Sequence, residues 1–171
     1  MEKTKAMPKR LLMPMIMMLL LFTSAIAQES ATILSGPALN RVVPNSFYYE
    51  GQSAPTQMRN AAAVRFGTKR FVIVGMVDTS GYSTEVQAKY QGFFITDSSI
   101  TVGGSELGPG AYGFGFSEDK LNIFDIGGGS VLSVGITKDS ALKRPRPLTM
   151  TKAADGVRLY SGRSYAVIAA K

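Results

Sequence analysis

Cysteine, histidine and tryptophan are all absent from the 171-residue chain. Without cysteine no disulfide can stabilise the fold, so side-chain packing alone must hold it together. Without histidine the chain lacks the usual general base near neutral pH, the usual zinc ligand and the central member of a Ser-His-Asp triad. Tryptophan is the best platform for stacking a sugar or a cation, and seven tyrosines are weaker substitutes. We therefore expect no metal ion and no cofactor.

The first 27 residues have the pattern of a secretory signal peptide. Four basic residues lie among the first ten, an apolar run covers residues 11–22, and Ala25-Ile26-Ala27 places small residues where a signal peptidase reads. Twelve apolar residues fall short of the roughly 20 that span a bilayer. We therefore expect cleavage before Gln28 and an exported protein, periplasmic or extracellular, with no transmembrane segment.

Residues 28–171 suit a single domain with one core. Without the first 27 residues, Lys plus Arg falls from 19 to 15 and Asp plus Glu from 12 to 11, so the net charge is about +4 rather than +7. The remaining sequence is rich in glycine and in β-branched residues, which is the composition of an all-β domain.

The clearest local pattern runs from Phe71 to Gln91. Phe71–Val77 is apolar and β-branched, which predicts a strand buried in the middle of a sheet. A polar turn at residues 78–81 ends this strand. Ser83 is a good N-cap, and a short helix over 83–91 is predicted to follow it.

The rest of the chain predicts mainly short strands. Residues 28–43 are expected to be an irregular lead-in with an edge strand near 32–35, Gln52–Asn60 a loop or an irregular edge, and 138–147 a long loop. Asp155-Gly156 predicts a hairpin turn. The predicted fold is a single-domain β-sandwich or partly closed barrel of about ten short strands with one short helix. Further strands are expected over 46–50, 61–66, 93–96, 100–102, 112–116, 121–126, 132–136, 148–152, 157–160 and 165–170.

One predicted strand carries its glycines on a single face. Tyr112, Phe114 and Phe116 alternate with Gly113 and Gly115, which places three aromatic rings on one side and bare backbone on the other. A glycine face indicates close approach by another group. The expected neighbour is the helix at 83–91 or an aromatic side chain, in preference to a ligand.

Four segments between Tyr48 and Lys171 carry a resemblance. They read YYEGQSAPTQMRN, VDTSGYSTEVQAKYQGFFIT, ITVGGSELGPGAYGFGF and GVRLYSGRSYAVI. The chain resembles a group of small exported bacterial β-proteins of uncharacterised function, and ITVGGSELGPGAYGF is similar to the gG-x-x-L-x-x-G-x-Y hairpin of a broader exported domain family. The resemblance implies a β fold and an export route, and it implies no reaction.

Asp78 is the candidate for catalysis. The sequence Asp78-Thr79-Ser80-Gly81 after an apolar strand is similar to the Asp-Thr-Gly loop of aspartic proteases, but Ser80 is inserted before the glycine. The favoured interpretation is that Asp78 and Ser80 accept backbone hydrogen bonds in the turn. A carboxylate-dependent hydrolase using Asp78 is kept as an alternative function.

A second carboxylate, Asp125, interrupts the apolar run LNIFDI. It requires solvent or a structural partner, for which Arg158 and Arg163 are the candidates. The glycine pairs and triplet at 103–104, 108–110 and 127–129 are interpreted as hairpin turns, because none is followed by the Lys-Ser/Thr pair of a phosphate loop.

Two candidate binding regions remain. Lys143, Arg144 and Arg146 form a proline-stiffened basic loop that suits anionic lipid head groups or acidic polysaccharide, while an exported protein seldom meets nucleic acid. The other region is where the segment holding Gln57 and Arg59 would meet the turn holding Asp78 and Tyr82.

The predicted function is a non-enzymatic binding or structural module of the cell envelope. Its ligand is an unknown envelope component or anionic polymer. Adhesion to anionic surfaces through residues 143–146 is the second alternative, beside the Asp78 hydrolase.

Overall fold

The computed structural model describes residues 30–171, so the predicted signal peptide lies outside the described residues. The larger of two antiparallel sheets has the order β1-β3-β4-β5-β8-β9-β10, with β2 paired to β3. Its strands are β1 (Ala31–Ile33), β2 (Ser46–Tyr49), β3 (Gln52–Phe66), β4 (Arg70–Val77), β5 (Gly92–Thr96), β8 (Gly110–Ser117), β9 (Lys120–Phe124) and β10 (Ser130–Gly135).

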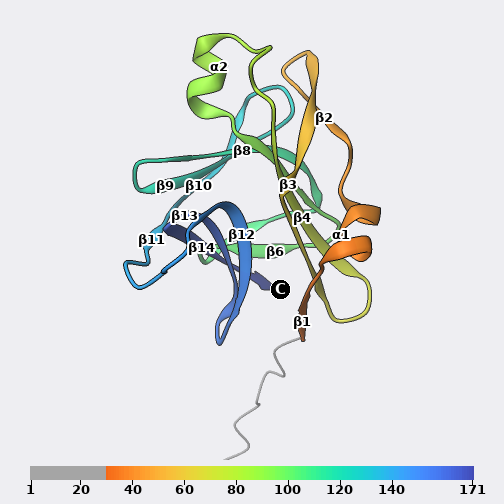
Figure 1. The fold of residues 1–171 in the computed structure, drawn as a ribbon, viewed down its shortest axis with the longest axis vertical. Coiled ribbons are helices and arrows are strands. Elements are labelled where there is room, and N and C mark those ends of the chain that lie inside the picture. The colour runs from red at the N-terminus through yellow and green to blue at the C-terminus, as the bar shows by residue number, and fades with distance from the viewer. Residues whose placement is uncertain (1–29) are drawn as a thin grey trace, which may run out of the picture.

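The smaller sheet has the order β12-β13-β14-β6-β7, with β11 paired to β14. Its strands are β6 (Ile100–Val102), β7 (Ser105–Leu107), β11 (Thr137–Lys138), β12 (Arg146–Ala153), β13 (Gly156–Gly162) and β14 (Ser164–Ala170). Two short helices, α1 (Gly36–Val42) and α2 (Thr84–Lys89), complete the described chain (Figure 1). Within residues 30–171 the sheets form a sandwich and no closed barrel, which confirms the predicted fold class.

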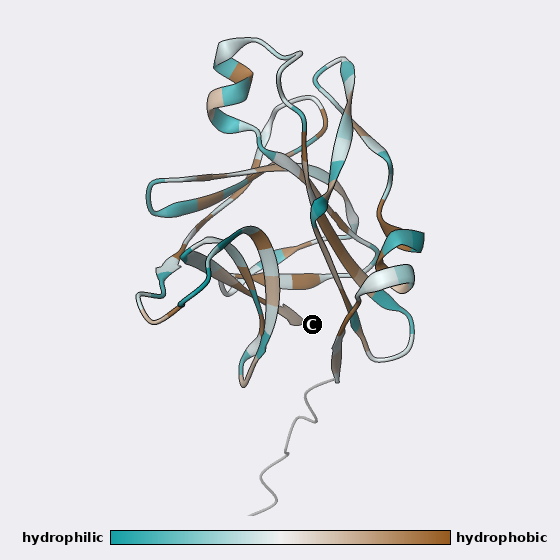
Figure 2. Ribbon diagram, viewed as in Figure 1, coloured by the Kyte–Doolittle hydropathy of each residue, from teal (hydrophilic) through white to brown (hydrophobic). Residues whose placement is uncertain are grey.

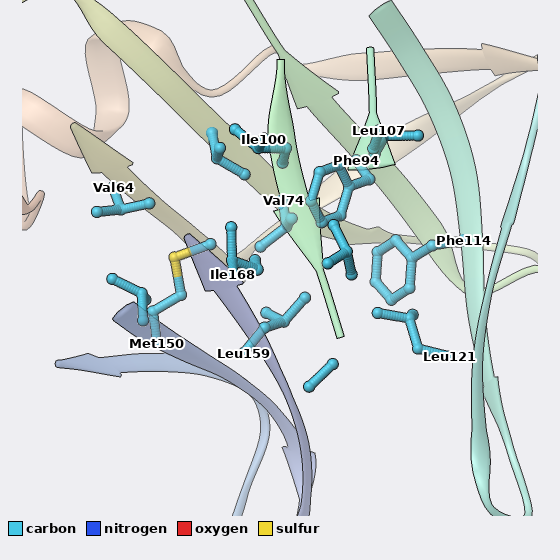
Figure 3. Close-up of a cluster of buried hydrophobic side chains, with 14 of the residues drawn as sticks. Val64, Val74, Phe94, Ile100, Leu107, Phe114, Leu121, Met150, Leu159 and Ile168 are labelled. Carbon is cyan, nitrogen blue, oxygen red and sulfur yellow. The ribbon is translucent and has the colours of Figure 1, made fainter. Parts of the chain in front are cut away.

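The main core lies between the two sheets. The larger sheet contributes side chains such as Phe94 and Phe114, and the smaller sheet contributes Leu159 and Ile168, all at most 1% exposed (Figure 3). Burying each such side chain contributes about 1.5–3 kcal/mol to the stability of the fold. This packing stabilises a chain that has no disulfides. Apolar residues follow the crossing strands, while many of the outer turns are hydrophilic (Figure 2).

A second cluster covers part of the opposite face of the larger sheet. We call it the aromatic cluster, and its rings belong to Phe47, Tyr49, Tyr82, Tyr90 and Phe93. The rings of Tyr49 and Tyr90 stack at 3.9 Å between centroids, and those of Phe47 and Phe93 at 5.2 Å. The strand β2 and the helix α2 are thereby held against the sheet.

The glycine face of β8 is filled by the neighbours that the sequence predicted. A Cβ on Gly113 would lie 2.5 Å from the Tyr49 ring, and one on Gly115 would overlap the carbonyl oxygen of Lys89 at the end of α2. Both the helix and an aromatic side chain therefore occupy this face, as expected. The predicted N-cap is also confirmed, since Ser83 Oγ accepts a hydrogen bond from the Val86 amide at 3.4 Å.

Two local predictions are wrong in part. The stretch Gln52–Asn60 is not a loop but the first part of the 15-residue strand β3. Pairing with β2 orders Gln52–Pro55, and a register shift between Thr56 and Ala61 in the ladder with β4 makes this edge irregular, as the other interpretation held. The polar composition of Gln52–Asn60 does not predict a strand, because this segment becomes one only by pairing with β2 and β4.

The irregular lead-in predicted for residues 28–43 contains the helix α1. Pro37 stands in the first turn, where its missing N–H costs nothing, and Arg41 lies in the last turn. No residue of α1 is fully buried, and its two partly buried side chains, Leu39 and Val42, make an apolar pattern too short to predict a helix. Residues 30–171 hold fourteen strands, more than the predicted count of about ten, and the short β7 and β11 are the two that match no predicted strand.

Candidate functional site

The two segments predicted to meet near Asp78 do lie together. Gln57 Nε2 donates to the Val77 carbonyl at 2.9 Å, and the hydroxyl of Tyr82 donates to the Gln52 carbonyl at 3.0 Å. The Asp78 amide donates to the Pro55 carbonyl at 3.0 Å. These bonds tie the turn after β4 to the start of β3, and they use Gln57 and Tyr82 as structural groups. Tyr82 is also buried in the aromatic cluster, at 6% exposed.

Asp78 itself is exposed and engaged within its own turn. Its Oδ1 accepts a hydrogen bond from the Ser80 amide at 3.0 Å, and this backbone bond lowers the pKa of the Asp78 carboxyl. A lowered pKa suits a carboxylate that stays ionised and does not suit a general acid.

Arg59, the remaining candidate of this region, is exposed on β3. Among residues 30–171 no group of three potential metal ligands occurs.

Asp125 is held by a glycine turn rather than by an arginine. Its Oδ1 accepts hydrogen bonds of 2.9 Å from the amides of both Gly127 and Gly129. The two arginines proposed as partners are engaged elsewhere. Arg158 lies over the Tyr165 ring, 4.6 Å from the ring centroid, and Arg163 donates to carbonyls of the loop before β12. Asp125 is exposed, so the alternative of solvent is confirmed and the alternative of a pair with Arg158 or Arg163 is wrong.

The loop over residues 139–145 is braced at its base by the β13–β14 hairpin. The Tyr160 hydroxyl donates to Asp139 Oδ2 at 2.9 Å, and the Asp139 amide donates to the Arg163 carbonyl at 2.8 Å. Arg163 Nη1 donates to the carbonyls of Ser140, at 3.3 Å, and of Leu142. Side chains on both sides of the β13–β14 turn thus fix the path of the loop.

Strand pairing gathers positive charge around this turn. Arg146 at the start of β12 pairs with Gly162, and Lys138 at the end of β11 pairs with Ser164, so the two flank Arg163. The braced loop adds two more cations next to Leu142. We call the resulting group the basic end, and all its members are exposed. They are Lys138, Lys143, Arg144, Arg146 and Arg163.

Charge is segregated along the described chain. Residues 137–171 hold eight Lys and Arg against two Asp, a net charge of +6, whereas residues 30–136 hold seven Lys and Arg against eight Asp and Glu, a net charge of −1. The carboxylate closest to the basic end in sequence, Asp139, is already bonded to Tyr160 and to the Ala141 amide. Among residues 30–171 no ion pair joins a cation of the basic end to a carboxylate, so its positive charge is left for solvent or for a ligand.

Sequence reasoning found three of these five cations and missed two. Lys143, Arg144 and Arg146 stand together in one loop, which made them visible. Lys138 and Arg163 join them only because β11 and β12 lie on either side of the β13–β14 turn. The net charge of +6 over residues 137–171 is the sequence signal that would have indicated the basic end.

Comparisons of the chain with models of protein families, with curated proteins and with solved structures find no match. The site is therefore interpreted from the geometry given above. In the part of the chain that the structure describes, no helix has the length and apolar character to cross a membrane.

Proposed function

We propose that this chain is an exported, non-enzymatic binding module of the cell envelope that engages an anionic polymer or surface through its basic end. The observation that carries the proposal is the convergence of five exposed cations around the β13–β14 turn, two of them on a loop held by hydrogen bonds to the β13–β14 hairpin. Asp78, the alternative site, offers one exposed carboxylate in a turn.

Several like charges in one place act together on a polyanion. A single exposed ion pair contributes about 0–1 kcal/mol, so binding at such a surface needs several contacts at once. The basic end supplies them within one surface, where a Debye length of about 8–10 Å leaves them only partly screened. The positive field also steers an anionic ligand toward this end of the molecule.

The bracing of the loop supports a binding role. Ordering a free loop on contact costs free energy that lowers affinity. Here Asp139, Tyr160 and Arg163 hold the loop before any ligand arrives. Lys143 and Arg144 are thereby presented on an ordered backbone.

The ligand chemistry that fits is a repeated carboxylate, sulfate or phosphate. Acidic polysaccharide and anionic lipid head groups share this chemistry, and both occur where an exported protein acts. Exposed lysine and arginine side chains on a surface recognise charge density rather than one sugar or one lipid. Broad binding to anionic polymers is therefore the expected behaviour.

The test is the triple variant K143Q/R144Q/R146Q, measured on immobilised dextran sulfate and on phosphatidylglycerol vesicles. The wild-type protein is expected to be retained by one or both probes at low salt, and the triple variant is expected to lose most of this retention. The matched control is R59Q/K69Q/K120Q, which removes three exposed cations outside the basic end. Equal loss in both variants would contradict the proposal, and so would equal retention.

A further inference from the structure

The strand β10 is an edge of the larger sheet. It pairs with β9 on one side, and within residues 30–171 no strand pairs with its other side. The strand β7 of the smaller sheet lies near β10 without being paired to it.

The pairing register shows which backbone groups face outward. Val134 pairs with Leu121, and the Ile136 amide donates to the Asp119 carbonyl at 2.9 Å in the same register. In an antiparallel ladder alternate residues bond the same neighbour. The N–H and C=O groups of Ser133 and Gly135 therefore point away from β9.

Other edges of the two sheets are protected against pairing. The edge strand β12 carries Arg146, Pro147 and Lys152, and charge and proline are the usual guards of an edge. The edge strand β7 is three residues long and carries Glu106, which pairs with Lys171 at 2.6 Å. The edges at β1 and β2 are only three and four residues long.

β10 lacks such protection along most of its length. No charged residue and no proline occurs from Ile126 to Thr137. Two of the three large exposed hydrophobic side chains of the described chain lie in this stretch, Ile126 at 48% and Val131 at 45% exposed. A register shift between Ser130 and Leu132 is the one irregularity, and it leaves Leu132–Gly135 as regular strand.

We propose that β10 pairs with β10 of a second copy of this chain, in antiparallel orientation, so that the larger sheets of two molecules become continuous. A twofold axis brings the residues nearest to it close to their own counterparts and places every other residue opposite another residue of the same strand, so charges of one sign within the strand would oppose pairing. The uncharged Ile126–Thr137 stretch meets this requirement, and the strongly basic β11–β12 region does not. This inference is independent of the proposed function.

The area of the β10–β10 contact sets the expected affinity of the dimer. A pair of six-residue strands buries less than the roughly 1,200 Å² of a standard interface, so the dimer is weak and depends on protein concentration. It is expected in sedimentation equilibrium of the wild-type protein near the upper end of its soluble range. A monomer throughout that range would overturn the proposal.

Two lysine variants locate the contact. Val131→Lys changes an exposed side chain, and Gly135→Lys adds one where a Cβ meets nothing within 4 Å, so both leave the fold intact. Each places a lysine from both copies within the paired strands, where desolvation and repulsion of the two charges oppose pairing, and is expected to weaken dimerisation about tenfold or more. The control is Thr151→Lys on the protected edge β12, which is expected to dimerise like the wild type. Dimerisation that persists in both lysine variants would overturn the proposal.

Cross-linking gives a readout that does not depend on a charge change. Because the chain contains no cysteine, a single introduced cysteine reports on one position only. Ser133→Cys, on an exposed position of β10, is expected to form disulfide-linked dimers on mild oxidation much faster than Thr151→Cys. Equal rates for the two variants would show that β10 is not the contact.

Discussion

The hydroxyl of Tyr160 donates a 2.9 Å hydrogen bond to Oδ2 of Asp139, joining the β13–β14 hairpin to the loop that carries Lys143 and Arg144 of the basic end. Tyr160 is 3% exposed, so this bond forms at the base of the loop and away from solvent. It connects the packing of the smaller sheet to the presentation of the cations. The ordered presentation of Lys143 and Arg144 depends on this connection.

Removing the Tyr160 hydroxyl tests whether the loop is braced. Tyr160→Phe keeps the ring against Tyr165 and leaves the Asp139 carboxylate without its partner. We expect a loss of about 1 kcal/mol in the free energy of unfolding and faster amide hydrogen exchange in residues 140–145. The control is Tyr165→Phe, whose hydroxyl does not bond the loop. Unchanged exchange in Tyr160→Phe would show that the loop is held by its other contacts.

The close approach of α2 to the larger sheet predicts opposite effects at two glycines. A Cβ at Gly115 would overlap the Lys89 carbonyl, whereas a Cβ at Gly135 would meet nothing within 4 Å. Gly115→Ala is therefore expected to destabilise the fold by about 1–3 kcal/mol. Gly135→Ala is expected to be neutral or to stabilise it by up to about 1 kcal/mol. Urea unfolding measures both, and similar values for the two variants would contradict this packing.

The aromatic cluster predicts the response of the protein to alkali. Burial raises the pKa of both Tyr49 and Tyr90 above the usual tyrosine value, with the charge of Glu50 adding to the rise at Tyr49 and nearby Tyr82 adding to it at Tyr90. Because the unfolded chain ionises first, the stability contributed by the neutral hydroxyls is complete below about pH 10 and is lost as the pH rises above it. Tyr49→Phe/Tyr90→Phe is expected to raise the pH of alkaline unfolding, followed by tyrosinate absorbance.

The same double variant tests the hydroxyls at neutral pH. Both hydroxyl oxygens are buried, and within the described structure neither has a hydrogen-bond partner of normal geometry. Removing an unpaired buried hydroxyl is neutral or stabilising, so the free energy of unfolding at pH 7 is expected to stay equal or rise. A loss of more than about 1 kcal/mol would mean that each hydroxyl is satisfied by an internal water.

Local signals explain which parts of the fold were predictable. The apolar run Phe71–Val77 and the cap at Ser83 depend on residues adjacent in the chain, and both are confirmed. The beginning of β3 is polar and becomes a strand only through its partners, so composition misled the interpretation of Gln52–Asn60. The helix α1 fully buries no residue, and its partly buried Leu39 and Val42 make a pattern too short to predict a helix.

The candidate site divides in the same way. The basic loop was visible because three of its cations are consecutive or nearly so. The contribution of Lys138 and Arg163 depends on strand pairing, which no local pattern specifies. The predicted meeting of Gln57 with the turn at Asp78 is confirmed, but its hydrogen bonds serve the fold.

Asp78 gives a prediction that separates a structural carboxylate from a catalytic one. Its pKa is lowered in the folded state, chiefly by the backbone hydrogen bond from Ser80. The stabilisation is therefore present above the unfolded pKa near 4 and is lost as the pH falls through the folded value. Asp78→Asn is expected to lower stability slightly at pH 7 and to match the wild type in strong acid, by thermal unfolding. A hydrolytic activity of the wild type that vanishes in Asp78→Asn would establish the alternative function.

The most direct test of the central claim is the salt dependence of binding to dextran sulfate. For a charge-driven contact the logarithm of the affinity falls linearly with the logarithm of the salt concentration, with a slope set by the number of cations engaged. The account predicts that K143Q/R144Q/R146Q reduces the magnitude of this slope by about two to three, while R59Q/K69Q/K120Q leaves it unchanged. The same slope in the wild type and in K143Q/R144Q/R146Q would contradict it.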